Sequence, residues 1–129
     1  MPFDNPPQTP FGDVGLLADA RSRIAEDGDW LKDRFQDGNR RCLVGALSLV
    51  AGSRSFDAPN RVERRLARRL AEQLPPQFAG WVAKMKFVTS RHRLIWFNDD
   101  PGTRHEDVIA LFDRAIDHLT IKAPVCVSM

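Results

Sequence analysis

The last third of the chain carries the pattern that most restricts its fold. Residues 103–106 read Thr-Arg-His-Glu, a helix capping box, and apolar side chains then recur at three- and four-residue intervals. The recurring positions are Val108, Ile109, Phe112, Ala115, Ile116 and Leu119. This stripe predicts an amphipathic helix closed by Pro124, and such a helix must bury its apolar face against other elements.

The pattern at the N-terminus predicts an arm and then a helix. Residues 1–12 contain four prolines and are expected to be extended. Asp13 is the expected N-cap of the first helix, and Gly28 its stop. Its apolar face consists of Leu16, Leu17, Ala20 and Ile24. Because no linker divides the chain, we expect a single helical domain over residues 13–122, followed by a tail over residues 123–129.

A second helix is expected in the segment around residue 45. It runs from Arg40 or Arg41 to Ala51, with Asn39 as its cap and Gly52 at its end. Its apolar positions are Leu43, Ala46, Leu47 and Val50.

A third helix is expected after Asp57 or Asn60, either of which can cap it. Pro75-Pro76 stops it. Its apolar side chains recur every four residues, at Val62, Leu66, Leu70 and Leu74. These segments together predict an all-α protein, a compact bundle of five or six helices.

Residues 77–98 leave two local structures open. The apolar set Phe78, Trp81, Val82, Met85 and Val88 follows the helical period, and Thr89 or Ser90 can cap a helix through Phe97. The alternative pairs Lys84–Thr89 with Arg93–Phe97 as strands, since both are rich in bulky residues. We favour helices, with an α+β fold carrying a small hairpin at residues 84–97 as the alternative.

Positive charge is concentrated in the middle of the chain. Residues 61–98 carry nine basic and two acidic side chains, whereas the chain as a whole has a net charge of +2. On the predicted third helix, the basic stripe is formed by Arg61, Arg64, Arg65 and Arg68. Such a surface suits a phosphate backbone, an anionic membrane or an acidic partner, although arginines on helix faces are often only solvated.

Cys42 follows two arginines and precedes two small residues. With Asn39 as cap, it occupies the third helical position, where free backbone amides and nearby cations favour thiolate over thiol. The same pattern is typical of a buried cysteine that lets two helices pack closely. The sequence leaves a reactive and a structural sulfur both open.

A nucleophilic Cys42 would need a base. The candidate imidazoles are His92 and His105, and Asn98 or Asp99 would orient one of them, as in papain-like hydrolases. Asn98 and Asp99 also fit ordinary turn chemistry before the last helix. There is no Cys-x-x-Cys pair and the histidines are scattered, so we expect no metal site and no cofactor.

Three short motifs resemble those of an uncharacterised family of small helical bacterial and phage proteins. They are the Gly-x-Trp segment Gly28–Trp30, the Cys-x-x-Gly-Ala-Leu helix Cys42–Leu47, and the Trp-x-Asn-Asp turn Trp96–Asp99. The resemblance spans about residues 14–120. It implies a helical domain and supplies no activity. The proline-rich arm and the apolar tail depart from the family pattern.

Two functions follow as hypotheses. The first is a binding or regulatory module that presents the basic helix to an acidic protein or nucleic-acid surface, with a homodimer as one form that could do so. The second is a hydrolase or acyl-transfer enzyme built on Cys42. The longest apolar run in the middle of the chain, Leu94–Phe97, is too short to cross a bilayer, and the N-terminus does not read as a signal peptide, so we expect a cytoplasmic protein.

Overall fold

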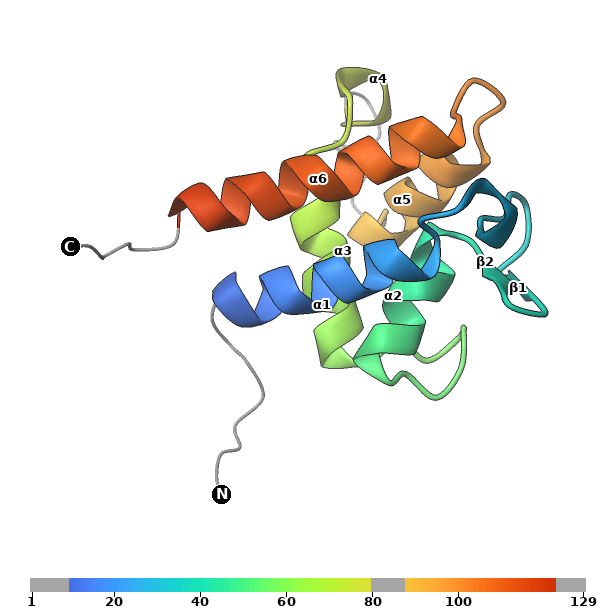
Figure 1. The fold of residues 1–129 in the computed structure, drawn as a ribbon, viewed down its shortest axis with the longest axis horizontal. Coiled ribbons are helices and arrows are strands. Elements are labelled where there is room, and N and C mark those ends of the chain that lie inside the picture. The colour runs from blue at the N-terminus through green and yellow to red at the C-terminus, as the bar shows by residue number, and fades with distance from the viewer. Residues whose placement is uncertain (1–9, 80–87, 123–129) are drawn as a thin grey trace.

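The computed structural model describes residues 10–79 and 88–122. These residues form six α-helices, one short 3₁₀ helix and one two-stranded hairpin (Figure 1). The elements in chain order are α1 (Pro10–Arg23), η1 (Asp27–Asp29), β1 (Gln36–Asp37), β2 (Arg40–Arg41), α2 (Leu43–Ala51), α3 (Arg61–Ala71), α4 (Pro76–Ala79), α5 (Ser90–Asp99) and α6 (His105–Lys122).

The predicted helical bundle is confirmed. A hairpin is also present, but it lies at Gln36–Arg41, where Gly38 takes the positive φ of 63° that its tight turn requires. Residues 93–97 lie in α5, so the alternative strand there is wrong and the favoured helix through Phe97 is confirmed, with the Thr89 side chain accepting from the backbone N–H of His92 as its cap. The other strand of the alternative hairpin, Lys84–Thr89, lies mostly outside the described residues. So does the helix predicted from Phe78 to Val88.

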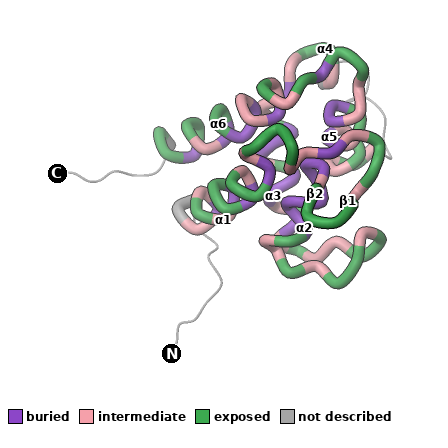
Figure 2. The backbone as a smooth tube through the Cα atoms, turned by 45° about the vertical axis from the view of Figure 1, so that its right-hand side comes forward, coloured by how far each residue is buried: buried purple, intermediate pink, exposed green. Residues whose placement is uncertain are grey.

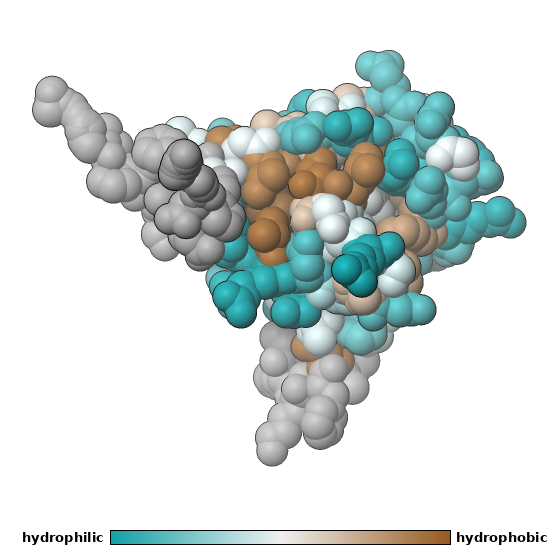
Figure 3. Space-filling model, turned by 90° about the horizontal axis from the view of Figure 1, so that it is seen from below, coloured by the Kyte–Doolittle hydropathy of each residue, from teal (hydrophilic) through white to brown (hydrophobic). Residues whose placement is uncertain are grey.

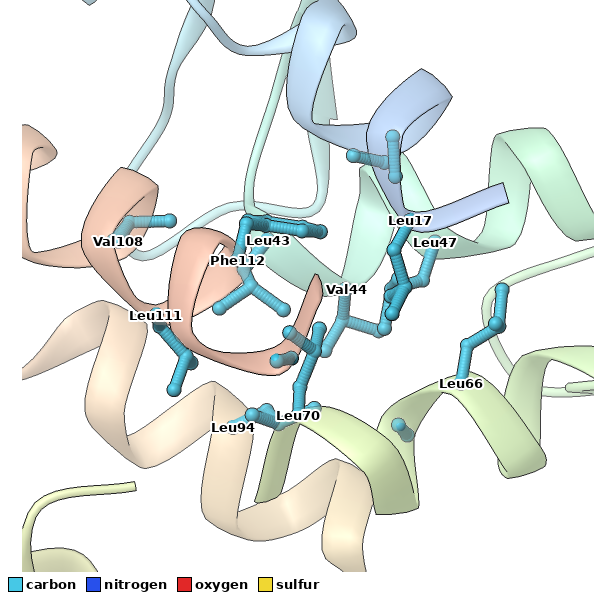
Figure 4. Close-up of a cluster of buried hydrophobic side chains, with 14 of the residues drawn as sticks. Leu17, Leu43, Val44, Leu47, Leu66, Leu70, Leu94, Val108, Leu111 and Phe112 are labelled. Carbon is cyan, nitrogen blue, oxygen red and sulfur yellow. The ribbon is translucent and has the colours of Figure 1, made fainter. Parts of the chain in front are cut away.

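Helix α2 lies at the centre of the core. Its residues from Leu43 to Ser48 are all buried, and it packs against α1, α3 and α5. Helix α1 runs alongside α6, and α3 packs on α5 (Figure 1). Figure 4 shows the resulting cluster, in which leucines of α1, α2, α3 and α5 meet Val108, Leu111 and Phe112 of α6. Buried residues lie along the facing sides of the helices, and exposed residues along their outer sides (Figure 2).

The apolar core also reaches the surface. Seen from below, the molecule shows a hydrophobic area bordered by hydrophilic residues (Figure 3). Leu49 of α2 is 40% exposed, and Val14, Val50 and Val62 are only half-buried where they pack against the core. Scattered apolar exposure of this kind is ordinary for a small domain.

The first predicted cap is wrong. Helix α1 begins at Pro10, a favoured residue in a first helical turn, so three residues of the expected arm are helical and Asp13 lies inside the helix. The helix ends at Arg23, before Gly28, because Ile24 and Ala25 make i→i−3 backbone bonds that tighten its last turn.

The second helix starts later than expected. Arg40 and Arg41 form β2, because the Arg41 carbonyl accepts from the backbone N–H of Leu31 and the Cys42 N–H donates to the Phe35 carbonyl. Cys42 is therefore the N-cap of α2, and not Asn39. Gly52 is its C-cap, as predicted.

The predicted cap of α3 is confirmed, and the predicted cap of α6 is shifted by one residue. The side chain of Asn60 accepts from the Glu63 N–H at 2.8 Å, which confirms it as the cap of α3. Helix α6 begins at His105, one residue later than its predicted capping box implies. The acid that accepts from the Arg104 N–H is consequently Asp107, at 2.9 Å, and not Glu106.

Two carboxylates with no exposed surface cross-link the helices. Asp13 of α1 accepts from Arg65 at 2.9 Å and from Arg69 at 3.0 Å, both on α3. Glu63 of α3 accepts from Ser48 of α2 at 2.6 Å and from Arg91 of α5 at 2.7 Å. Since each buried charge has cationic or hydroxyl partners, the pairs hold α1, α2 and α5 in position on α3. None of the described helices has the length and hydropathy needed to span a membrane.

We predict that Asp13→Asn lowers the free energy of unfolding by about 3 kcal/mol, because Arg65 and Arg69 then lose the carboxylate that neutralises them. Urea denaturation measures the change. The control is Asp19→Asn on the same helix, whose carboxylate is exposed and pairs with Arg23 at 3.3 Å. A loss of under about 0.5 kcal/mol is expected for that exposed pair, and equal losses for the two variants would contradict the assignment.

Candidate functional site

The three sequence motifs meet at one buried amide. Asn98, in the last turn of α5, is 1% exposed. Its Oδ1 accepts from the indole N–H of Trp30 at 2.7 Å and from the backbone N–H of Leu43 at 3.2 Å. Its Nδ2 donates to the Leu31 carbonyl at 3.0 Å. Asn98 thus lies at the start of the helix that follows Cys42, and its hydrogen bonds hold the backbone and the Trp30 side chain rather than a histidine.

Asp99 continues this cluster toward the surface. Its Oδ1 accepts from Nδ2 of Asn98 at 3.0 Å and from the backbone N–H of Asp33 at 2.8 Å. Asp33 has a φ of 62°, an uncommon conformation for a residue with a side chain. Beside it lies a pocket of about 120 Å³, whose lining includes Cys42, Asn98 and Asp99.

Cys42 uses its sulfur to cap α2. The Sγ accepts from the backbone N–H of Gly45 at 3.2 Å, and the residue is 6% exposed. Burial raises the pKa of the Cys42 thiol and outweighs the backbone N–H groups of Gly45 and Val44, which lower it, while the negative charge of Asp99 adds a smaller increase. The sulfur is held as a thiol at neutral pH, which is the opposite of what its place beside two arginines suggests.

Neither candidate base is hydrogen-bonded to Cys42 in the described residues. The Nε2 of His105 is 2.6 Å from the Ile24 carbonyl oxygen, and its ring lies 5.7 Å from that of Trp30. The Nδ1 of His92 is 3.0 Å from the hydroxyl of its own helix cap, Thr89. A cysteine hydrolase needs a thiol and an imidazole within hydrogen-bond reach, and the described side chains do not form that pair.

The basic stripe divides into two groups. Arg61, Arg64 and Arg68 are exposed. The side chain of Arg65 is only 11% exposed and pairs with Asp13 across the α1–α3 contact. Arg61, Arg64 and Arg68 lie within about 60° of one another around α3, whereas Arg65 lies about 100° from Arg64, on the side where it meets Asp13 of α1.

The exposed arginines border a pocket between α3 and the start of α5. It has a volume of about 210 Å³, and Arg64, Arg68, Ser90 and Arg91 are among the residues that line it. None of the described residues that line it is acidic. The sequence prediction did not include Ser90 or Arg91. Both residues lie within the basic segment 61–98. No local sequence pattern, however, indicates which residues of two separate helices will line the same pocket.

A protein site for a metal ion usually needs several His, Cys, Asp or Glu side chains close together. Within residues 10–79 and 88–122, no cluster of three or more His, Cys, Asp or Glu side chains is arranged to bind one. The chemistry available at the pocket is therefore that of guanidinium and hydroxyl donors, which suits recognition of an anion.

We predict that Gly45→Ala destabilises the protein by about 2 kcal/mol, because the new Cβ would lie 2.5 Å from the carbonyl oxygen of Phe35. The control is Gly15→Ala in α1, where the Cβ would have no atom within 4 Å and alanine favours the helix. Thermal unfolding should show a lower Tm for the first variant and an equal or higher Tm for the second. A Gly45→Ala protein as stable as the parent would refute the close contact.

We predict that Cys42 resists alkylation in the folded protein. In a Cys126→Ser background, iodoacetamide should modify it at least about tenfold more slowly than in urea, because the buried sulfur is a thiol. The pH at which the native rate is half-maximal should lie above the ordinary value of 9.0. Since deprotonation is easier in the unfolded chain, stability should decrease as pH rises past that chain's thiol pKa. Rapid labelling at pH 7 would contradict the structural role.

Comparison with known proteins gives a family and no activity. Residues 10–118 match the model of a family described as "Family of unknown function (DUF6197)". No curated protein and no solved structure matches the chain. The matched range includes Trp30, Cys42 and Asn98, whose segments meet in the structure, and it covers most of the chain. The chain therefore belongs to DUF6197, a family of unknown function.

Proposed function

We propose that this protein is a binding module that holds an acidic partner or polyanion against the exposed face of α3. The observation that supports it is the gathering of Arg64, Arg68 and Arg91 around one pocket that no described acidic residue lines. Arg61 extends the same exposed face by one turn toward the start of the helix. Cations so close together repel one another, and an anionic partner relieves that repulsion.

The arginines of α3 fall into two groups by the partners that they have within the fold. Arg65 and Arg69 share the buried carboxylate of Asp13, so their charge is largely compensated within the fold. Arg61, Arg64 and Arg68 form no ion pair with any described residue. The acidic side chains elsewhere in the protein lie in the outer parts of the sequence, where residues 99–129 carry three basic and six acidic groups.

The attraction would be short-ranged under physiological conditions. Exposed charges are screened over about 8 Å at 0.15 M ionic strength, so the arginines act on a partner only when it lies close to α3. Guanidinium groups at set positions along α3 then give an acidic segment both its location and its orientation, because they donate in a planar fork to carboxylate or phosphate oxygens. The proposed binding role needs no reacting group.

We predict that the variant Arg61→Gln/Arg64→Gln/Arg68→Gln binds a heparin oligosaccharide at least about tenfold more weakly than the parent, because three uncompensated charges are lost. Fluorescence anisotropy at several salt concentrations measures affinity and its salt dependence. The slope of log affinity against log salt should become shallower in the variant.

The matched control removes the same number of charges elsewhere. Arg34, Arg40 and Arg104 have side chains that are 70%, 51% and 74% exposed and lie outside α3. Their triple glutamine variant should retain affinity to within about threefold. An equal loss in both triple variants would show that net charge alone governs binding, and the proposal for α3 would be wrong.

A further inference from the structure

We infer that the pocket between α3 and α5 is a phosphomonoester site that receives a phosphorylated serine or threonine side chain of a partner peptide. This inference rests on the proposed function and names the chemical group that the basic face recognises. Its starting point is the charge balance at the pocket. Arg64, Arg68 and Arg91 line it, and Arg91 is neutralised by Glu63, which leaves two uncompensated guanidinium charges.

A phosphomonoester matches that balance. It carries close to two negative charges at neutral pH and three strong acceptor oxygens. A phosphodiester of a nucleic-acid backbone carries one charge, as does the carboxylate of aspartate or glutamate. A pocket of about 210 Å³ has room for a phosphoryl group at the end of a side chain.

Arg91 is a rigid wall of the site. Its Nε donates to the buried Glu63 at 2.7 Å, and its guanidinium lies 4.3 Å from the centre of the Phe56 ring. Its second terminal nitrogen donates to the Phe56 carbonyl. These contacts hold the side chain in one conformation before any ligand arrives, which lowers the entropy cost of binding.

Arg64 and Arg68 supply the groups that can move onto a ligand. Arg64 donates one N–H to the Pro59 carbonyl at 2.6 Å, which leaves its other donors available. The Arg68 side chain, exposed one turn along α3, makes no hydrogen bond or ion pair within the described part of the chain. Two flexible guanidinium groups facing one rigid wall can donate to several oxygens of one phosphoryl group at the same time.

The described lining fits a peptide side chain. Pro59 and Ala67 contribute apolar surface, while Thr89 and Ser90 place two residues with hydroxyl groups at the start of α5. Among the described residues that line the pocket none is aromatic, whereas sites that bind single-stranded nucleic acid usually stack its bases on aromatic rings. The described lining therefore favours a phosphorylated side chain over the end of an oligonucleotide.

The first experiment compares two small probes by NMR with the full chain. Methyl phosphate at pH 7.5 should shift the backbone amide signals of Ser90 and Arg91 and the Nε–H signals of Arg64 and Arg68. Dimethyl phosphate, a monoanion, should bind at least about tenfold more weakly. The Arg68→Gln variant should lose at least about tenfold in methyl phosphate affinity, while Arg104→Gln on the exposed surface should be unchanged. Equal binding of the two probes would overturn the inference.

The second experiment identifies the carrier of the phosphoryl group. The peptide Ac-Gly-Ser(PO₃)-Gly-NH₂ should bind at least about tenfold more tightly than the same peptide with glutamate. A 5′-phosphorylated oligonucleotide that bound more tightly than the phosphopeptide would overturn the assignment to a protein partner.

The two proposals fail separately. If heparin binding depends on Arg61, Arg64 and Arg68 but methyl phosphate shifts no signal at the pocket, the basic face remains a binding surface and the phosphomonoester site is wrong. If heparin binding is also independent of these arginines, both are wrong. Both Arg64 and Arg68 are exposed, so their variants should fold as the parent does, which circular dichroism verifies.

Discussion

The hydrogen bonds of the Asn98 side chain tie together the segments on which the rest of the fold depends. Its oxygen accepts from Trp30 and Leu43, and its nitrogen donates to the carbonyl of Leu31 and to Asp99. An amide that is removed from water must find such partners or destabilise the protein. The requirement places the segment after η1, the start of α2 and the end of α5 at one point. Helix α2, the centre of the core, is anchored there.

The two buried carboxylates have a complementary effect on α3. Asp13 draws Arg65 and Arg69 inward, and Glu63 draws in Arg91 from α5. These pairs compensate part of the charge of the basic segment inside the fold and leave Arg61, Arg64 and Arg68 on its outer side. The same pairs bring the start of α5 next to α3, which creates the pocket. Packing and the proposed recognition of anions thus arise from one set of contacts.

Cys42 illustrates how burial can outweigh a favourable local setting. A helix N-terminus and neighbouring arginines stabilise a thiolate in an exposed position. Here Cys42 is 6% exposed, its sulfur accepts from Gly45 and lies near the charge of Asp99, so the cost of desolvating an anion prevails. Gly45, three residues after Cys42, lies so close to the Phe35 carbonyl that a side chain at this position would clash with it. The Cys-x-x-Gly motif is accounted for by packing.

By itself the sequence determined the helical class and the apolar faces, and it narrowed two caps to Asp57 or Asn60 and to Thr89 or Ser90, because helical periodicity and capping depend on residues within one or two turns. It also indicated the basic block and the importance of Cys42 and Asn98. Only the tertiary structure decided that Asp13 pairs with arginines and caps nothing, that the hairpin lies at Gln36–Arg41, and that Ser90 and Arg91 complete a pocket with α3. Those outcomes depend on contacts between residues far apart in the chain. No local sequence pattern indicates which of several polar partners a buried group will contact in the folded protein.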